Sequence, residues 1–360
     1  MILIPLDPVG SNDVYRYIWD GKVQSAGINP YKYAPLDSQL NFLRSDSQPP
    51  KFNFPHLKTI YFPFSEMIFF AAYKISGESI WGIKIFLFLF ELITILMISL
   101  ILKKLNLPRK NILYYVLCPL PIFQFFVDGH IDAVGASLII AAIYFFISNK
   151  KISAFILLGL SLSIKPTGLL LIPIIFFTEN KLRERLHVLI IPPAVSGILF
   201  LPYLFGVNPF EALENFAANW TFNGVVFNLL NSYFDYNQKT RIICAVLLII
   251  AYALVLLSKK VALQKIYLSM FLLLIFSPVV HPWYVAWLAV LVPVAFRWSG
   301  LFFISLISLT SITIMNYELG EAWKEYPVVL FVEYAPVLIF FIYEMIKESS
   351  QPFFTFSEKQ

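Results

Sequence analysis

The sequence has few charged residues, few cysteines and few histidines, and these shortages narrow the class of protein. Charged residues make up 14% of the 360, against about 25% in a typical soluble chain. The two cysteines, Cys118 and Cys244, both lie in apolar runs and offer neither a disulfide framework nor a metal site. The net charge of +5 is modest and does not call for a nucleic-acid partner.

Apolar and aromatic residues are correspondingly abundant. The residues AVILMFWYC make up 59% of the chain, against roughly 45–50% in a typical protein even with glycine counted. Aromatic residues alone make up 17%, including 36 phenylalanines. A soluble protein of this size could not hide so much apolar surface. The composition therefore predicts a polytopic membrane protein.

Eleven apolar segments follow residue 79, and most reach the roughly 17–25 residues that a membrane span needs. In lipid the backbone must satisfy its own hydrogen bonds, which long aliphatic runs do as helices. We therefore predict an all-α bundle of about 11 transmembrane helices. The segments run near 80–102, 111–127, 131–148, 152–164, 166–178, 187–204, 241–257, 263–280, 283–296, 299–315 and 328–346.

Lys and Arg fall almost entirely in alternate connections between these segments, which predicts the orientation of the chain. The basic side is expected to be cytoplasmic. Three parts follow from this: an extracytoplasmic loop with a juxtamembrane helix at 1–79, a bundle at 80–346 and a cytoplasmic tail at 347–360. The basic residues on the predicted cytoplasmic side are Lys103, Lys104, Arg109, Lys110, Lys150, Lys151, Lys181, Arg183, Arg185, Lys259, Lys260, Lys265, Arg297, Lys347 and Lys359.

The predicted orientation raises a question at the N-terminus. Residues 1–6 form an apolar stub that is too short for a span and does not resemble a signal peptide. Either the first loop is exported by an unusual route or a first helix precedes the sequence. We favour the second alternative.

The predicted outer loop, residues 7–62, is polar, aromatic and rich in proline. In it Asp13 and Asp20 are seven residues apart, so a helix would place both on one face with Arg16 between them. Two interpretations stay open: a solvated, salt-bridged helix, or a general base with a cation beside it. For residues 65–76 two predictions stay open: a short helix in the membrane interface, or the first turn of the next membrane span.

Three further clusters fall on the same side. The DGHID sequence places Asp128, His130 and Asp132 at an outer turn, where they could ligate a metal, orient a histidine base or cap a helix. Lys165, followed by Pro166, interrupts two short apolar halves. It should face a cavity or reach outward to the membrane surface, and phosphate is a common partner of lysine.

The last cluster combines a histidine with aromatic residues. His281 lies at an outer helix end beside Trp283 and Tyr284, which could form an interfacial belt, whereas a titratable imidazole at this depth is a functional candidate. Asn223 belongs to an outer loop, with Asn215, Asn219, Trp220 and Asn228, that suits either carbohydrate hydroxyls or turns. His56 and His187 show no such context and are interpreted as incidental.

Taken together, these clusters indicate either an enzyme that acts on an anionic, lipid-linked substrate or a transporter or flippase of lipid-linked saccharides. A resemblance favours the enzyme. SNDVYRYIWDGKVQSAGINPYKYAP resembles the first outer loop of bacterial GT-C integral-membrane glycosyltransferases of the mannosyltransferase-like, polyprenyl-phosphate-sugar-dependent branch. GHIDAVGA, LSIKPTGLLLIP and HPWYVAWL also look like motifs of that family, in the expected order.

PPKFNFPHLKTIYFPFSE resembles the next family segment but departs from it at two places. The family form is nearer to Asn-His-Pro followed by Tyr-Pro-Pro. Here Phe54 stands in place of the expected histidine, and Phe62, Pro63 and Phe64 replace the double proline. The resemblance therefore assigns no role to these two places.

The resemblance implies a function and a site. The expected enzyme is an inverting hexosyltransferase, with mannose as the first sugar to test, that transfers the sugar from polyprenyl phosphate to a lipid or glycan acceptor at the outer face of the inner membrane. Asp13 would be the general base. Lys165, His281 and Arg16 would bind the donor phosphate. A divalent metal stays open, and no nucleic acid is expected. The expected substrate pocket comprises Asp20, Tyr15, Asp128, His130, Asp132, Asn223, Trp283 and Tyr284.

Overall fold

The computed structural model describes residues 5–44, 52 and 54–350. The first four residues of the N-terminal stub, part of the PPKFNF motif and residues 351–360 of the predicted tail lie outside the described residues. Within the described part the chain is helical and has no named strand, only isolated bridges between residues 222–223 and Val279. The all-α architecture predicted from the sequence is therefore confirmed.

Each of the eleven predicted apolar segments contains helix, but the helices differ in length. Five are long and apolar enough to cross a membrane: Trp81–Lys104, Leu182–Tyr203, Asn237–Leu257, Trp298–Tyr317 and Pro327–Lys347. A pair bent by 46°, Arg109–Val116 and Pro119–Val127, could make a sixth span. The helices in the other five segments have 8–16 residues. Eleven crossings therefore remain a prediction, whereas a multi-pass membrane architecture agrees with the structure.

The main helices are α1 (Asp13–Ser25), α2 (Pro63–Ser76), α3 (Trp81–Lys104), α4 (Leu113–Val116), α5 (Pro119–Pro121), α6 (Asp132–Ile147), α7 (Lys151–Leu162), α8 (Leu171–Thr178), α9 (Leu182–Phe200), α10 (Glu211–Asn219), α11 (Val225–Phe234), α12 (Asn237–Leu257), α13 (Ala262–Phe276), α14 (Pro282–Ala289), α15 (Trp298–Leu306), α16 (Ser311–Glu318) and α17 (Pro327–Ser350). Short 3-10 turns include Pro166–Leu170, and Ile122–Val127 is a π-helical turn.

Three of the long helices expose large apolar side chains. Ile190 in α9, Ile249 in α12 and Ile339 in α17 leave 61, 66 and 64% of their surface uncovered. Exposed apolar surface on this scale is unfavourable in water and suited to contact with lipid. The composition thus has a structural counterpart, because the apolar excess covers the outside of the bundle as well as its core.

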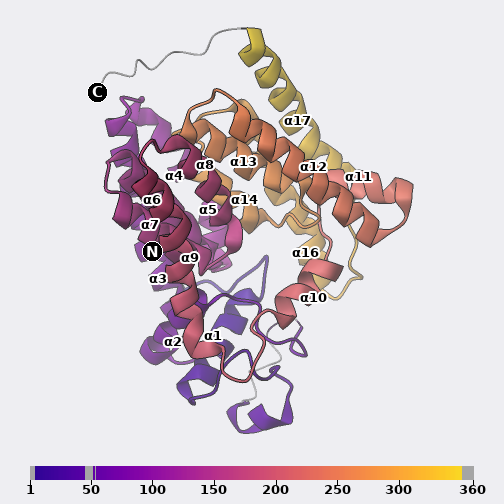
Figure 1. Cartoon of the computed structure of the whole chain (residues 1–360). Coiled ribbons are helices and arrows are strands. Elements are labelled where there is room, and N and C mark those ends of the chain that lie inside the picture. Colours follow the sequence, from indigo (N-terminus) through magenta and orange to yellow (C-terminus); the bar gives the residue numbers. More distant parts are fainter. Residues whose placement is uncertain (1–4, 45–51, 53, 351–360) are drawn as a thin grey trace.

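The outer loop folds into two helices that pack on each other below the bundle (Figure 1). The ring of Tyr17 in α1 stacks on that of Phe69 in α2, with centroids 4.3 Å apart. At Gly21 the helices are so close that an added Cβ would lie 2.3 Å from the Phe69 carbonyl oxygen. Helix α2 ends at Ser76 and α3 starts at Trp81. Residues 65–76 are therefore part of a separate helix and not the first turn of the next span.

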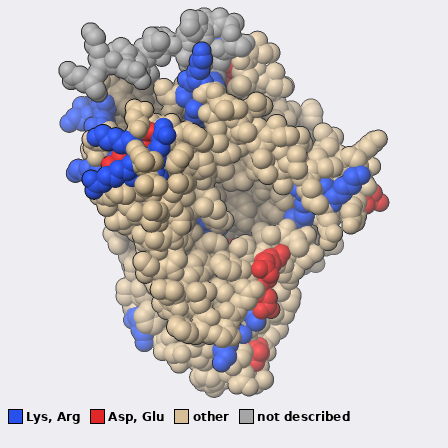
Figure 2. Space-filling view, in the orientation of Figure 1, with Lys and Arg blue, Asp and Glu red and all other residues tan. Residues whose placement is uncertain are grey.

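Basic residues gather at the opposite end of the molecule. Figure 2 shows the largest group of Lys and Arg at its upper left, away from α1 and α2 at the bottom of the same view. Residues from two different interhelical turns line one cleft there, among them Lys151, Lys181 and Arg183. These two basic connections therefore share one end of the molecule.

Candidate active site

A cavity of about 670 Å³ lies between the outer loop and the bundle. The view in Figure 2 is hollowed between its two halves. Residues far apart in the sequence meet in the cavity wall. Four segments contribute to it: the start of α1, the 128–132 turn, the break after α7 and the start of α14. Seven of the predicted site residues line it: Asp13, Arg16, Asp132, Lys165, His281, Trp283 and Tyr284.

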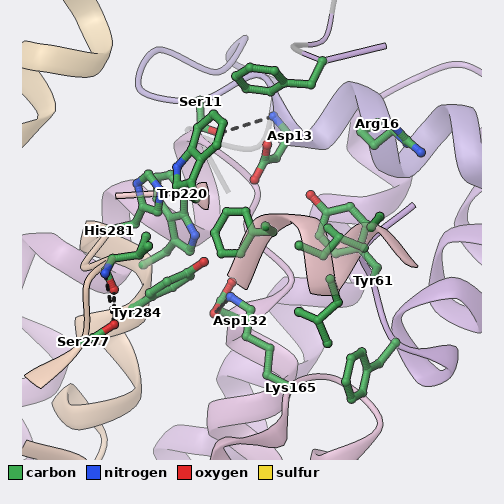
Figure 3. A pocket seen from close by; sticks show the side chains of 18 of the residues that line it. Ser11, Asp13, Arg16, Tyr61, Asp132, Lys165, Trp220, Ser277, His281 and Tyr284 are labelled. Carbon is green, nitrogen blue, oxygen red and sulfur yellow. Dashed lines mark hydrogen bonds and ion pairs between the residues drawn. The ribbon is translucent and has the colours of Figure 1, made fainter. Parts of the chain in front are cut away.

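Asp13 is the first residue of α1 and faces the cavity (Figure 3). Its side chain is 40% exposed, and it lines the cavity among aromatic side chains. Loss of contact with bulk water in the largely apolar cavity raises the pKa of Asp13 to about 6. The nearby charge of Lys165 lowers this pKa, that of Asp132 raises it, and the Tyr61 hydroxyl lowers it. A carboxylate with a pKa near neutrality is a suitable general base at physiological pH.

Lys165 and Asp132 form an ion pair on the opposite wall. The distance from Lys165 Nζ to Asp132 Oδ1 is 2.5 Å, and Trp287 Nε1 donates to the same oxygen at 2.6 Å. Lys165 Nζ also lies 4.2 Å from the ring centroid of Tyr284, a cation–π contact. Of the two arrangements predicted for Lys165, the structure therefore shows the cavity-facing one, as Figure 3 illustrates.

Three rings form a stack beside these charged groups. The ring of His281 stacks on Trp283 at 4.2 Å, and the ring of His130 stacks on the same indole at 3.8 Å. Burial and the positive charge of Lys165 lower the pKa of His281 to about 3. His281 is therefore neutral at physiological pH and can offer a hydrogen bond to an anion, but not the positive charge expected from the sequence.

The 128–132 turn gives each of its three polar residues a different environment. The Asp128 carboxylate accepts hydrogen bonds from the backbone N–H groups of Val9 and Gly10, and so anchors the segment that leads into α1. His130 is fully buried behind the cavity wall and points toward Asp13. Asp132 alone lines the cavity. Capping of α6, the simplest interpretation of the motif, therefore does not account for the contacts of these three residues, and among the described residues no side chain caps this helix.

Asp20 also lies away from the cavity, although it shares α1 with Asp13. Its carboxylate accepts a hydrogen bond from Arg16 Nε at 2.9 Å, and both side chains are buried. Arg16 Nη1 donates to the Leu57 carbonyl oxygen. Arg16 still reaches the cavity lining, whereas Asp20 fixes this arginine in place. Arg16, which lies between the two aspartates on α1, therefore forms its ion pair with Asp20.

Two further predicted pocket residues lie outside the lining. The Tyr15 hydroxyl donates to Asp7. Asn223 is buried, and its backbone and side chain bond to Glu325, Glu333 and Tyr334. Asn223 therefore holds the neighbouring wall of the cavity in place instead of facing it. In total Asp20, Tyr15, Asp128, His130 and Asn223 do not line the cavity.

The structure also adds residues outside the predicted site. His56, interpreted as incidental, and Tyr61 line the cavity, as does Trp220 of the outer loop that contains Asn223. The Phe54 ring meets that of Trp220 edge-on at 4.7 Å, and Lys58 Nζ pairs with Glu211 Oε2 at 2.7 Å, so residues 54–62 contact α10 and the following loop. The dense aromatic residues in FNFPHLKTIYFPF were the available signal. Within the described residues no three His, Cys, Asp or Glu side chains are placed to hold a metal ion.

Comparison with protein families identifies the chain. A model described as "Alpha-(1->6)-mannopyranosyltransferase, N-terminal domain" matches residues 2–179, and one described as "MptB C-terminal domain" matches residues 217–345. Together they match most of the chain. It belongs to the alpha-(1->6)-mannopyranosyltransferase family. The mannosyltransferase is thus a hexosyltransferase and a multi-pass membrane protein, which confirms the resemblance read from the sequence. A comparison with curated proteins finds no match.

Proposed function

We propose that this mannosyltransferase is an inverting enzyme that moves mannose from a polyprenyl-phosphate donor to a hydroxyl group of a lipid or glycan acceptor, at the extracytoplasmic face of the inner membrane. One observation carries the proposal. A single cavity contains an accessible carboxylate with a raised pKa, Asp13, and a lysine, Lys165, close enough for their charges to interact. These are the two groups that such a transfer requires, a base and a partner for the leaving phosphate.

Asp13 is the base in this mechanism. It takes the proton from the acceptor hydroxyl while that oxygen attacks the anomeric carbon, and the bond from this carbon to the phosphate oxygen breaks. Among the described residues two carboxylates line the cavity, Asp13 and Asp132, but Asp132 Oδ1 already accepts from Lys165 and Trp287. Retention by double displacement, as in most retaining glycosidases, uses a second carboxylate as nucleophile. One free carboxylate supports direct displacement, and therefore inversion.

The leaving group is polyprenyl phosphate, which gains negative charge as the bond breaks. Lys165 lies in the cavity wall with its ammonium group held by Asp132 and the Tyr284 ring. A cation fixed in this way stabilises the developing charge without having to reorganise. Neutral His281 adds a hydrogen bond to the phosphate. Arg16 contributes positive charge from the side of α1, and the Nη2 atom of Arg16 has no hydrogen-bond partner among the described residues.

The cavity wall has an apolar part and a polar, aromatic part, which suits substrates of two kinds. The apolar part comes from the break after α7 and from α13 and α14, and consists of Ile164, Met270, Leu273, Leu274 and Leu288. The polar part comes from the outer loop and from α10, and includes Lys58, Asn215 and Asn219 beside Trp220. We assign the first to the polyprenyl chain of the donor and the second to the acceptor, because aromatic faces and amide groups suit sugar rings.

The predicted division of the chain fits this arrangement. Residues 1–79 would form the extracytoplasmic, catalytic part, residues 80–346 the membrane bundle and residues 347–360 the cytoplasmic tail. The cavity lies at the α1–α2 end, away from the basic turns. By the distribution of Lys and Arg in bacterial membrane proteins, the basic end is cytoplasmic. The alternative of a transporter or flippase loses support, because the family is one of sugar transferases.

The decisive experiment measures transfer of radiolabelled mannose from polyprenyl-phosphate-mannose to an extracted lipid acceptor by the full chain in liposomes. Asp13→Asn keeps the shape of the side chain but removes the base, so we expect a loss of about a hundredfold or more in kcat. Asp7→Asn is the matched control, because Asp7 is an exposed carboxylate of the same outer loop and does not line the cavity.

Three results would contradict the proposal. Wild-type rates in Asp13→Asn would remove Asp13 as the base. A product with retained anomeric configuration, determined by NMR, would exclude direct displacement. Movement of the intact labelled donor across the liposome membrane, without transfer of mannose, would support the transporter instead.

A further inference from the structure

His130 does not line the cavity, yet within the described part of the chain its side chain is buried without the hydrogen bonds that a buried imidazole normally makes. The side chain is fully buried, and neither ring nitrogen has a hydrogen-bond partner among the described residues. Leaving a buried polar atom without a partner is unfavourable, because the atom loses its hydrogen bonds to water on burial. Such an atom in a folded protein calls for an explanation.

The Asp13 carboxylate lies close to this imidazole. His130 Nδ1 lies 3.7 Å from Asp13 Oδ2. This distance is too long for a hydrogen bond, which spans about 2.7–3.2 Å for a nitrogen donor. However, hydrogen bonds of catalytic groups are commonly long without substrate and shorten when it binds. The exposed fraction of the Asp13 side chain, 40%, gives the carboxylate room to rotate toward the ring.

The imidazole itself is held firmly by its surroundings. Its ring stacks on Trp283 at 3.8 Å and an interplanar angle of 16°. The preceding residue, Gly129, has φ of +78°, and an added Cβ there would lie 3.1 Å from the Val14 side chain. Only glycine adopts this backbone conformation readily while allowing α1 to pack so closely. The turn therefore places a rigid ring directly behind the first residues of α1.

The charge state of His130 fixes what it can offer to Asp13. Burial lowers the pKa of His130 well below its usual value, and the positive charge of Lys165 lowers it further. The ring is therefore neutral and carries a proton on one nitrogen. An unprotonated Nδ1 would direct its lone pair at a carboxylate, so the tautomer with the proton on Nδ1 is the favourable one while Asp13 is ionised.

We propose that His130 is a positioning residue for the catalytic base: its Nδ1–H donates a hydrogen bond to Asp13 Oδ2 when substrate is bound and holds the carboxylate toward the acceptor hydroxyl. This inference rests on the proposed function, in which Asp13 is the base. It gives the buried histidine of the GHID motif a role that differs from contact with the sugar.

The consequence can be measured in the pH profile. A hydrogen bond to the ionised form lowers the pKa of a carboxylate, so loss of this bond raises the pKa of Asp13 in the enzyme–substrate complex. Because kcat reports the ionisations of that complex, the acid limb of kcat moves to higher pH. The other charged and titratable groups around Asp13 stay in place in the variants: Lys165, Asp132, Tyr61, Arg16, Tyr17 and Tyr284.

The experiment compares three variants of the full chain in liposomes. In His130→Asn the amide nitrogen takes roughly the place of Nδ1, whereas in His130→Gln it takes roughly that of Nε2. His130→Phe keeps a flat ring against Trp283 but has no donor. We expect the Gln and Phe variants to lose about ten- to a hundredfold in kcat and to shift the acid limb upward by roughly one pH unit. We expect the Asn variant to keep the limb near that of the wild type.

The possible outcomes separate this inference from the proposed function. An unchanged limb and kcat in His130→Phe and His130→Gln would overturn it, as would an equal shift in His130→Asn and His130→Gln, which would indicate a merely structural role. If His130→Phe does not fold, the Asn and Gln pair decides. Activity in Asp13→Asn would instead refute the proposed base. His187→Phe, at the other end of the bundle, should behave as the wild type.

Discussion

Asp132 and Lys165 are 33 residues apart in the sequence, yet their charged groups meet at 2.5 Å in the wall of the cavity. The pair exists because α6 begins at Asp132 and α7 ends three residues before Lys165, so that both residues lie at the same end of two adjacent antiparallel helices. In the proposed mechanism the donor phosphate approaches this pair. Asp132 then competes with the phosphate for Lys165.

This competition leads to opposite predictions for the two partners. Lys165→Ala removes the cation that stabilises the leaving phosphate, so we expect kcat/KM for the donor to fall by about a hundredfold or more. Asp132→Asn leaves Lys165 charged but without its counter-ion, so we expect KM for the donor to decrease. Steady-state kinetics with varied donor concentration will check both. An increase in KM for the acceptor alone in Lys165→Ala would show that this lysine does not bind the donor.

The pH dependence of transfer should report the ionisation of Asp13. The base acts only when it is ionised, and loss of contact with bulk water raises the pKa of Asp13 to about 6. We therefore expect kcat/KM to rise about tenfold per pH unit below this value and to level off above it. His281 stays neutral throughout, because its pKa is lowered to about 3. Initial rates at low substrate concentration between pH 4.5 and 8 test this, at roughly half-unit steps. A limb near the ordinary carboxylate pKa of about 4 would contradict it.

The orientation of the chain can be tested with single cysteines. Ser38, in the outer loop, and Lys110, in a basic connection, are both exposed, whereas Cys118 and Cys244 are buried. We expect a membrane-impermeant maleimide to label Ser38→Cys in intact cells, and Lys110→Cys only after the membrane is opened. This follows from the preference of Lys and Arg for the cytoplasmic side. The reverse labelling pattern would place the cavity on the cytoplasmic side.

The sequence predicted the helical bundle, and several of the polar residues that it singled out meet in one cavity, for a physical reason. Long apolar runs have one stable conformation in lipid, and polar residues at their ends must gather where water or a cavity can receive them. Asp13, Asp132, Lys165 and His281 come from four separate stretches of the chain, and the structure brings all four to one cavity.

What the sequence could not predict is what lies opposite each side chain. The seven-residue spacing correctly placed Asp13 and Asp20 on one helix, but Asp20 meets Arg16 while Asp13 meets the cavity. The burial of His130 depends on the turn at Gly129 and on Trp283, which is distant in sequence. Spacing along one element determines a face, whereas the partner of that face is set by packing between elements.

The close approach of α1 and α2 gives a prediction about the part of the fold that carries the base. An added Cβ at Gly21 would lie 2.3 Å from the Phe69 carbonyl oxygen and 2.9 Å from Tyr73 Cβ. Because the nearest of these atoms belongs to the backbone, Gly21→Ala must push the two helices apart, and overpacking of this kind costs about 1–3 kcal/mol. We therefore expect a lower thermal midpoint in detergent and reduced transfer, since Asp13 lies only two turns away on α1.

The matched control is Gly197→Ala, in the interior of α9. An added Cβ at Gly197 meets nothing within 4 Å, and alanine is favoured over glycine in a helix by about 1 kcal/mol. We expect this variant to be at least as stable as the wild type and equally active. If Gly21→Ala matched Gly197→Ala in both thermal midpoint and transfer rate, the tight contact between α1 and α2 would not be what holds Asp13 at the cavity.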